Sequence, residues 1–131
     1  MPATYATYDD IKAICPWIDQ IRLASDTDDF EVHRMAANIW LDNAVRVATG
    51  NSRVSVVTDK RVVRACAYKA ASEILATQIT PLQSDNAYEH LSARFQRVAE
   101  NTLSSLVVRV RDERGSCQEI NLGVVKRGSH G

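Results

Sequence analysis

The stretch TDKRVVRACAYKAASEILATQI, from Thr58 to Ile79, decides the fold. Apolar side chains recur along it at the spacing of one helical face: Val63, Ala67, Ala70 and Ile74, widened by Cys66, Ala71 and Leu75. Thr58 or Asp59 can cap the first turn, because a short side-chain oxygen accepts a hydrogen bond from an unpaired helical N–H group. Thr80 and Pro81 end the helix, since proline cannot continue the hydrogen-bond ladder. Alanine and cysteine make up much of this face, so we expect neighbouring helices to pack closely around it.

A second long helix is predicted from about Asp29 to Thr49. Thr27 or Asp28 can cap its start, and Gly50 is a usual stop. Its apolar residues fall into two sets on different faces, so we expect this helix to contact neighbours on two sides. The first set is Phe30, Ala37, Leu41, Ala44 and Ala48, and the second is Val32, Ala36, Ile39, Trp40 and Val47.

A third long helix is predicted from about Asn86 to Leu106, with one apolar stripe and one solvent-exposed face. The stripe consists of Tyr88, Leu91, Phe95, Val98, Thr102 and Leu106. Before these helices, Asp9 and Asp10 open a capped first turn of a short helix, which Pro16 interrupts. Between the first two long helices, residues 51–57 form a short connection whose β-branched side chains favour an extended backbone.

The pattern changes after Ser105, where alternating apolar and polar residues predict a strand at Val107–Arg111. The run DERGS, Asp112–Ser116, predicts a hairpin turn, and Ile120–Val125 predicts a second strand. We therefore expect one mainly α domain. Residues 1–8 form an N-terminal arm, 9–106 a bundle of three long helices plus a short one, 107–125 a β-hairpin and 126–131 a mobile tail.

Composition narrows the class of protein. The 131 residues fit one domain of common size. Sixteen basic and sixteen acidic residues give a formal net charge of zero, which argues against a general nucleic-acid binder. Three cysteines lie far apart in the sequence, so they indicate neither a disulfide framework nor a zinc site, and they suit a reducing, cytosolic setting. No run approaches the about 20 apolar residues of a membrane span, so we expect no membrane partner.

Motifs that carry catalysis are absent from the sequence. Its five glycines form no phosphate-binding loop, and no metalloprotease, serine-hydrolase or Cys–His pattern occurs. The acidic run around Asp28 lacks the glycine and the spaced glutamate of a calcium loop, so we interpret it as helix capping. His33 and His90 fall within helical periods beside charged residues, which favours surface positions. We therefore expect no enzyme and no catalytic, cofactor-binding or metal-binding residues.

Basic residues gather at two places. Lys60, Arg61 and Arg64 open the central helix, so a small helical DNA-binding regulator that uses this helix start is an alternative function. Arg109 and Arg111 lie on one face of the first strand of the hairpin. They suit an acidic partner protein or passing DNA, although a solvated strand face explains them equally well.

The order of elements resembles the head–tail connector, or adaptor, proteins of tailed bacteriophages. The resemblance is carried by the opening Tyr5-Ala6-Thr7-x-Asp9-Asp10-Ile11, the helix after SDTDD, the alanine-rich helix Val62–Ala76, the helix beginning Tyr88-Glu89-x-Leu91, and the strand Val107–Arg111. It covers nearly the whole chain. No single one of these features is diagnostic.

The resemblance implies a structural protein without catalysis or cofactor. Such adaptors form a ring, commonly of twelve copies, that joins the portal protein to the stopper or tail and continues the DNA channel without gripping the DNA. The chain would be made in the host cytoplasm and located in the neck of the virion. A two-stranded hairpin alone is marginal in water, and exposed strand edges pair readily with other chains. We therefore expect partner contacts at both ends of the chain: Tyr5, Tyr8, Arg109, Arg111, Ile120, Leu122, Val124, Lys126 and Arg127.

Overall fold

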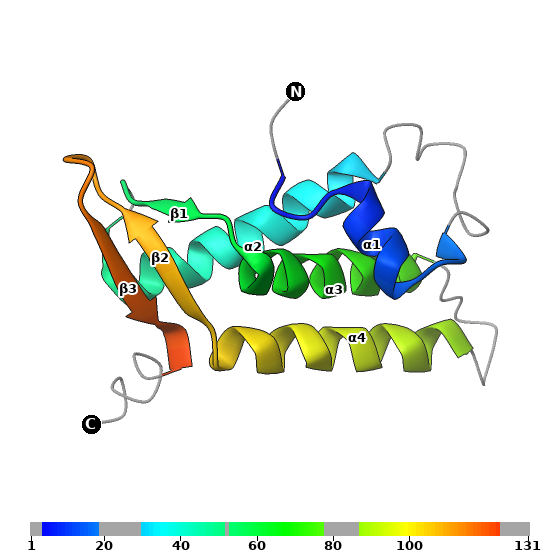
Figure 1. Ribbon diagram of the computed structural model, residues 1–131. Coiled ribbons are helices and arrows are strands. Elements are labelled where there is room, and N and C mark those ends of the chain that lie inside the picture. The colour runs from blue at the N-terminus through cyan, green and yellow to red at the C-terminus, as the bar shows by residue number, and fades with distance from the viewer. Residues whose placement is uncertain (1–3, 19–29, 52, 78–86, 124–131) are drawn as a thin grey trace.

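The computed structural model describes residues 4–18, 30–51, 53–77 and 87–123, and these form a helical body with a small sheet at one end (Figure 1). The mainly α fold predicted from the sequence is confirmed. The helices are α1 (Tyr8–Ile14), α2 (Glu31–Thr49), α3 (Lys60–Ala76) and α4 (Ala87–Ser104), and the strands are β1 (Ser55–Val57), β2 (Val107–Arg111) and β3 (Cys117–Asn121).

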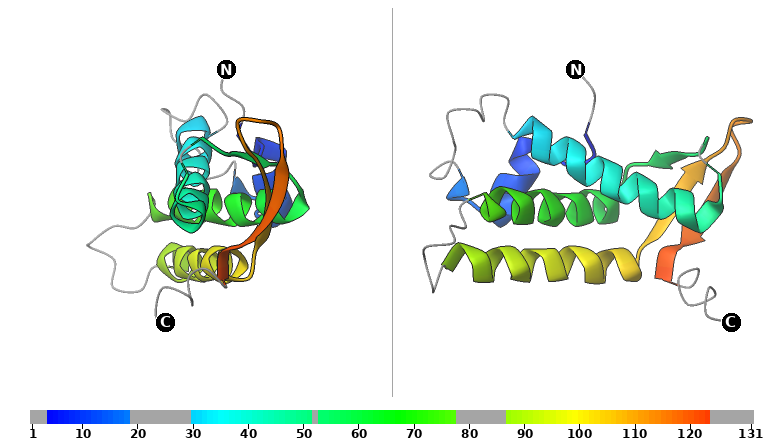
Figure 2. Two further views of the ribbon diagram at one scale, coloured as in Figure 1. Left: turned by 90° about the vertical axis from the view of Figure 1, so that its left-hand side faces the viewer. Right: turned by 180° about the vertical axis from the view of Figure 1, so that it is seen from behind.

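Helix α3 is the centre of the body and contacts α1, α2 and α4 (Figures 1 and 2). Asp59 is its N-cap, as predicted, and accepts hydrogen bonds from the N–H groups of Arg61 and Val62. Small residues line its buried surface, which lets three helices approach it: Ala65, Cys66, Ala67, Ala70 and Ala71. The helix ends at Ala76, and the stop predicted at residues 80–81 lies outside the described residues.

Helix α4 packs along α3 through both aromatic and polar contacts. The rings of Tyr68 and Phe95 meet edge to face at 5.5 Å. Gln96 Oε1 accepts hydrogen bonds from Lys69 Nζ and from the Ser72 hydroxyl, at 3.0 and 3.1 Å. These polar contacts satisfy groups that the close approach of the two helices partly buries.

Helix α2 begins at Glu31 and ends at the left-handed Gly50 (φ 66°), which confirms the predicted stop. No side chain caps its start, where Phe30 has φ 62°, and the predicted caps Thr27 and Asp28 lie outside the described residues. One face of α2 is buried, through Ala37, Asn38, Leu41 and Val45. The expectation of contacts on two sides holds in part within the described part of the chain: Trp40 of the second apolar set packs against the core and beside Lys69, whereas Val32, Ile39 and Val47 are exposed.

Helix α1 begins one residue before the predicted acidic start. Thr7 is the N-cap: its hydroxyl accepts from the N–H of Asp10, while the Asp10 carboxylate accepts from the N–H of Thr7. Asp9 and Asp10 therefore occupy the first turn, where their charge suits the helix dipole, but neither is the cap. The helix ends at Ile14, before Pro16, as predicted.

The sheet has three antiparallel strands in the order β1-β2-β3: the predicted hairpin is present as β2 and β3, and β1 adds a third strand to it. β1 lies in the connection that was expected to be extended, and its Val56 pairs with Val110. The predicted turn is confirmed: the left-handed Gly115 (φ 82°) follows Asp112, whose carboxylate accepts from two turn N–H groups. Val108 and Val110 point from β2 into the same hydrophobic core as the helices.

Strand β3 occupies Cys117–Asn121 and not the predicted Ile120–Val125. The turn is tight, so pairing resumes at once, with Arg111 opposite Cys117. The residues at the start of β3 do not alternate between apolar and polar, so the sequence pattern did not indicate a strand at that point. Leu122 has already left the strand, and its N–H donates to the carbonyl oxygen of Leu106 at 3.0 Å.

Candidate protein-interaction site

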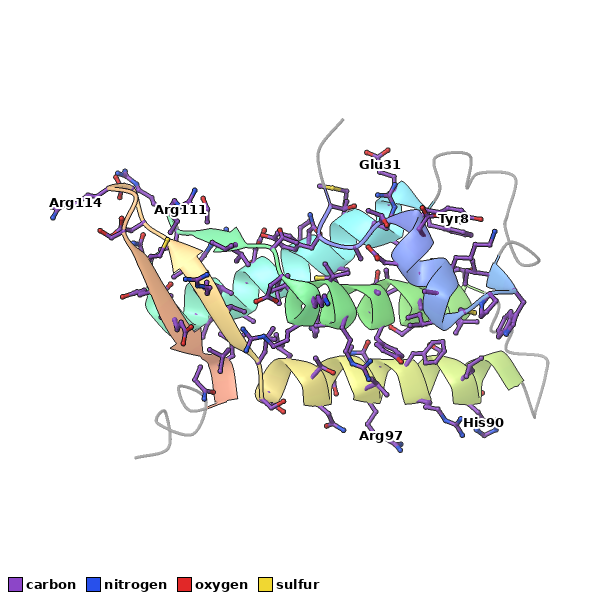
Figure 3. The ribbon with its side chains drawn as sticks, viewed as in Figure 1. Tyr8, Glu31, His90, Arg97, Arg111 and Arg114 are labelled. Atoms are coloured by element: carbon purple, nitrogen blue, oxygen red, sulfur yellow. The ribbon has the colours of Figure 1, made fainter. Side chains whose placement is uncertain are left out.

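The sheet lies at the end of the body where α3 begins and α4 ends, and its hairpin projects beyond the helices (Figure 1). On β2, Arg109 and Arg111 are exposed on the face opposite the buried valines. Arg114 reaches outward from the tip of the hairpin (Figure 3). Every residue of β3 except the half-buried Ile120 is exposed. This end of the molecule therefore presents strand backbone and arginine side chains at its surface.

The two outer strands each have an open edge within the described part of the chain, because β1 and β3 both pair with β2 alone. The N–H of Asp112 donates to Ser116, and that of Leu122 donates to Leu106, so even-numbered residues of β3 bond inward. The N–H groups of the odd-numbered residues, including Glu119, therefore point away from β2. Such a row of outward groups is a template for another strand.

The contact residues predicted on the hairpin fall into three groups. Arg109 and Arg111 are exposed, but β2 is the central strand, so only their side chains are accessible. Ile120 is half-buried against the core, and Leu122 is 6% exposed within this chain. The remaining predicted contacts lie outside the described residues: Val124, Lys126 and Arg127.

The two tyrosines predicted as contacts pack against their own chain. The Tyr5 hydroxyl donates to Asp42 at 2.5 Å, and the Tyr5 N–H donates to Asn38 at 2.9 Å. Burial, and then the bond to the Asp42 carboxylate, raise the pKa of Tyr5 well above its ordinary value. The Tyr8 ring stacks on Phe30 at 6.3 Å. These contacts hold the described part of the arm on the bundle.

The basic start of α3 has acidic neighbours. Arg61 pairs with Asp59 at 3.2 Å, and the Arg64 guanidinium lies 5.1 Å from the centre of the Tyr68 ring. Asp59 and Asp10 line the same open groove as Lys60 and Arg64. Their carboxylates reduce the positive potential that the alternative DNA-binding role requires.

The described residues hold no group of histidine, cysteine or acidic side chains suited to a metal ion. Burial raises the pKa of the Cys15 thiol to about 11 and that of Cys66 to about 12, so neither is a reactive thiolate near neutral pH. A cavity of about 310 Å³ lies between the end of α2 and β1, and the Tyr5–Asp42 pair lines it. The helices that the structure describes include none long and apolar enough to cross a membrane.

A second surface is formed by one row of α2. Val32, Ile39 and Val47 are 79%, 57% and 82% exposed, although each is a large apolar residue. We call this row the outer face of α2. The sequence indicated that this face is apolar, but periodicity cannot distinguish a face covered by the same chain from one left open.

Comparisons with known protein families, with curated protein sequences and with solved structures find no match to this chain.

Proposed function

We propose that this chain is a structural adaptor of the neck of a tailed bacteriophage. It forms a ring that joins the portal protein to the stopper or tail and continues the channel through which DNA passes. The element order of the structure agrees with what the sequence resemblance implies: an arm, a helical body with an alanine-rich central helix, and a late β element. The formal net charge of zero suits a conduit that does not bind DNA.

The three-stranded sheet at the end of the body is the observation that carries this proposal. In the described part of the chain it has two open edges, one on β1 and one on β3. The two edges belong to one short sheet, but different strands form them, so the two edges are not equivalent surfaces. A contact between the β3 edge of one copy and the β1 edge of the next is therefore head to tail, and such contacts form rings when the rotation closes. Arg109 and Arg111 lie beside these edges, where they can contact acidic groups of the portal or the stopper.

Co-expression with the portal protein of the same genome tests the proposal. We expect the two proteins to copurify, and electron microscopy to show a ring of this chain stacked on the portal ring. The chain alone can remain small, since contacts that depend on added strands can form only on the portal. A chain that never joins the portal ring, at any ratio of the two proteins, would overturn the adaptor function.

A further inference from the structure

The hydrogen-bond register of the sheet determines which main-chain groups reach its two edges that are open within the described part of the chain. On β3 these groups belong to the odd-numbered residues, such as Glu119, because the even-numbered ones bond to β2. The odd-numbered residues of β2 then bond to β1, in pairs with Ser55 and Val57. Val56 lies between these pairs, so its N–H and C=O groups point away from β2 and can bond to an added strand.

The two edges differ in the face of the sheet to which their outward residues belong. Val56 lies opposite Val110, whose side chain is buried, so Val56 is on the inner face, toward the core. Glu119 lies opposite Arg109, whose side chain is exposed, so Glu119 is on the outer face. Directly opposite residues of paired strands share a face. This difference therefore constrains how the β3 edge of one copy can join the β1 edge of the next.

An antiparallel contact would turn over each successive copy. Bonded residues lie directly opposite each other in an antiparallel pair, so Val56 would face Glu119 or another outer-face residue of β3. The inner face of one copy would then continue as the outer face of the next. Repetition of that step advances along the sheet with a half-turn each time, which gives an open filament. In a parallel pair, each residue bonds to the two neighbours of the residue opposite it, so Val56 faces an even-numbered, inner-face residue and the faces agree.

We propose that β3 of one copy and β1 of the next form a parallel strand pair, with Val56 opposite Ile120. The pair rests on the proposed adaptor function and specifies the contact between its copies. Successive sheets keep the same strand direction and the same inner face, so each copy repeats the last with only the rotation that closes a ring. All the helical bodies then lie on one side of the shared sheet.

The inner face favours this register over the neighbouring one, in which Val56 would face Gln118. Ile120 is half-buried and packs against the core, whereas Gln118 is exposed. Val56 also packs against the core of its own chain. The apolar row of Val108 and Ile120 therefore continues into the next copy, where water would otherwise reach both edge side chains.

The outer face has complementary groups in the same register. Ser55 of the next copy lies opposite Glu119, so its hydroxyl can donate to the carboxylate. Arg53 of that copy lies diagonally across from Glu119, within the reach of a long side chain. Within its own chain, Arg53 is 74% exposed and pairs with Glu113 at 3.3 Å, and such an exposed ion pair is weak enough to exchange.

A pair of cysteines tests the direction and the register of the contact. In a Cys117→Ser background, which removes the exposed native thiol, Ser55→Cys and Glu119→Cys are combined in one chain. Within a chain the two positions lie on strands that flank β2, about 10 Å apart, so every disulfide joins two copies. We expect mild oxidation of rings on the portal to link most copies, seen as a ladder of species up to the closed ring on a non-reducing gel.

Two matched variants report the alternative contacts. Ser55→Cys with Ile120→Cys, in the same background, brings its cysteines together in the antiparallel contact that places Val56 opposite Glu119. Ser55→Cys alone, with the native Cys117 retained, links copies in the parallel register that places Val56 opposite Gln118. We expect each of these variants to link several-fold less than the Ser55–Glu119 pair.

The outcomes separate this contact from the adaptor function. Stronger linking of either matched variant would overturn the proposed pair, and so would rings on the portal in which the Ser55–Glu119 pair does not link. Such rings would leave the adaptor function in place. Links in the free chain at millimolar concentration, without rings on the portal, would contradict the adaptor function and support the strand pair.

Discussion

Asp59 fixes the residue at which α3 begins. Its carboxylate accepts from the N–H groups of Arg61 and Val62 at 2.9 and 3.0 Å, and neither group has a partner earlier in the helix. Asp59→Ala should therefore lower the free energy of unfolding by about 1 kcal/mol, measured by urea denaturation. Asp59→Asn keeps an acceptor and is the matched control, with a smaller loss. An unchanged unfolding free energy in the alanine variant would show that the cap is dispensable.

The same carboxylate makes this contribution depend on pH. Burial alone would raise the pKa of Asp59, but the N–H groups of Val62 and Arg61, with the Arg61 guanidinium, bring it below its ordinary value. The cap contribution is therefore full above the unfolded-state pKa of about 3.9, and it is lost as the pH falls through the lower folded-state pKa. The difference between the unmodified chain and Asp59→Ala should shrink below about pH 4.

At the scale of elements, the open edge of β3 is the feature that substitution can test most directly. The N–H of Glu119 points away from β2, so Glu119→Pro removes an outward donor without removing a hydrogen bond of the sheet. We expect this variant to keep its helical circular dichroism and, under the proposed adaptor function, to fail to form rings on the portal. Glu119→Ala, which keeps the N–H, should form them. Rings from the proline variant would exclude this edge as the contact between copies.

The elements also show where sequence patterns suffice. Helices α2, α3 and α4 and strand β2 follow from the period of their apolar residues, and the Asp59 cap of α3 and the Gly50 stop of α2 add to it. β1 is three residues long, and nothing near it in the sequence specifies that it pairs with β2. The bounds of β3 were misplaced because Cys117, Gln118 and Glu119 are all polar or small. The open edges, which carry the candidate site, depend on strand order, and that is a long-range property.

At the scale of the whole molecule, helices and sheet share one core. Val110 of β2 is 1% exposed and belongs to the same cluster as the buried residues of α3. Val110→Ala removes two buried carbons and should destabilise the chain by about 2 kcal/mol. Because Trp17 and Trp40 pack on the helical side of that core, tryptophan fluorescence and helical circular dichroism should shift to lower urea together.

The control for this prediction is Arg111→Ala, an exposed change on the same strand, which should leave the urea midpoint almost unchanged. If the urea midpoint from tryptophan fluorescence of Val110→Ala stayed in place while the midpoint from circular dichroism moved, the sheet would be a separate folding unit.

The pairing of Val56 with Val110 has a consequence for synthesis of the chain. The two residues are 54 positions apart, so the ribosome must add the whole of α3 and α4 before β1 can acquire its neighbour. At about 5–20 residues per second, that interval lasts roughly 3–11 seconds. During this time a nascent chain carries a β1 strand whose partner β2 has not yet been made. The chain is then most open to strand capture by chaperones or by other nascent copies, and the arrival of β2 ends that period.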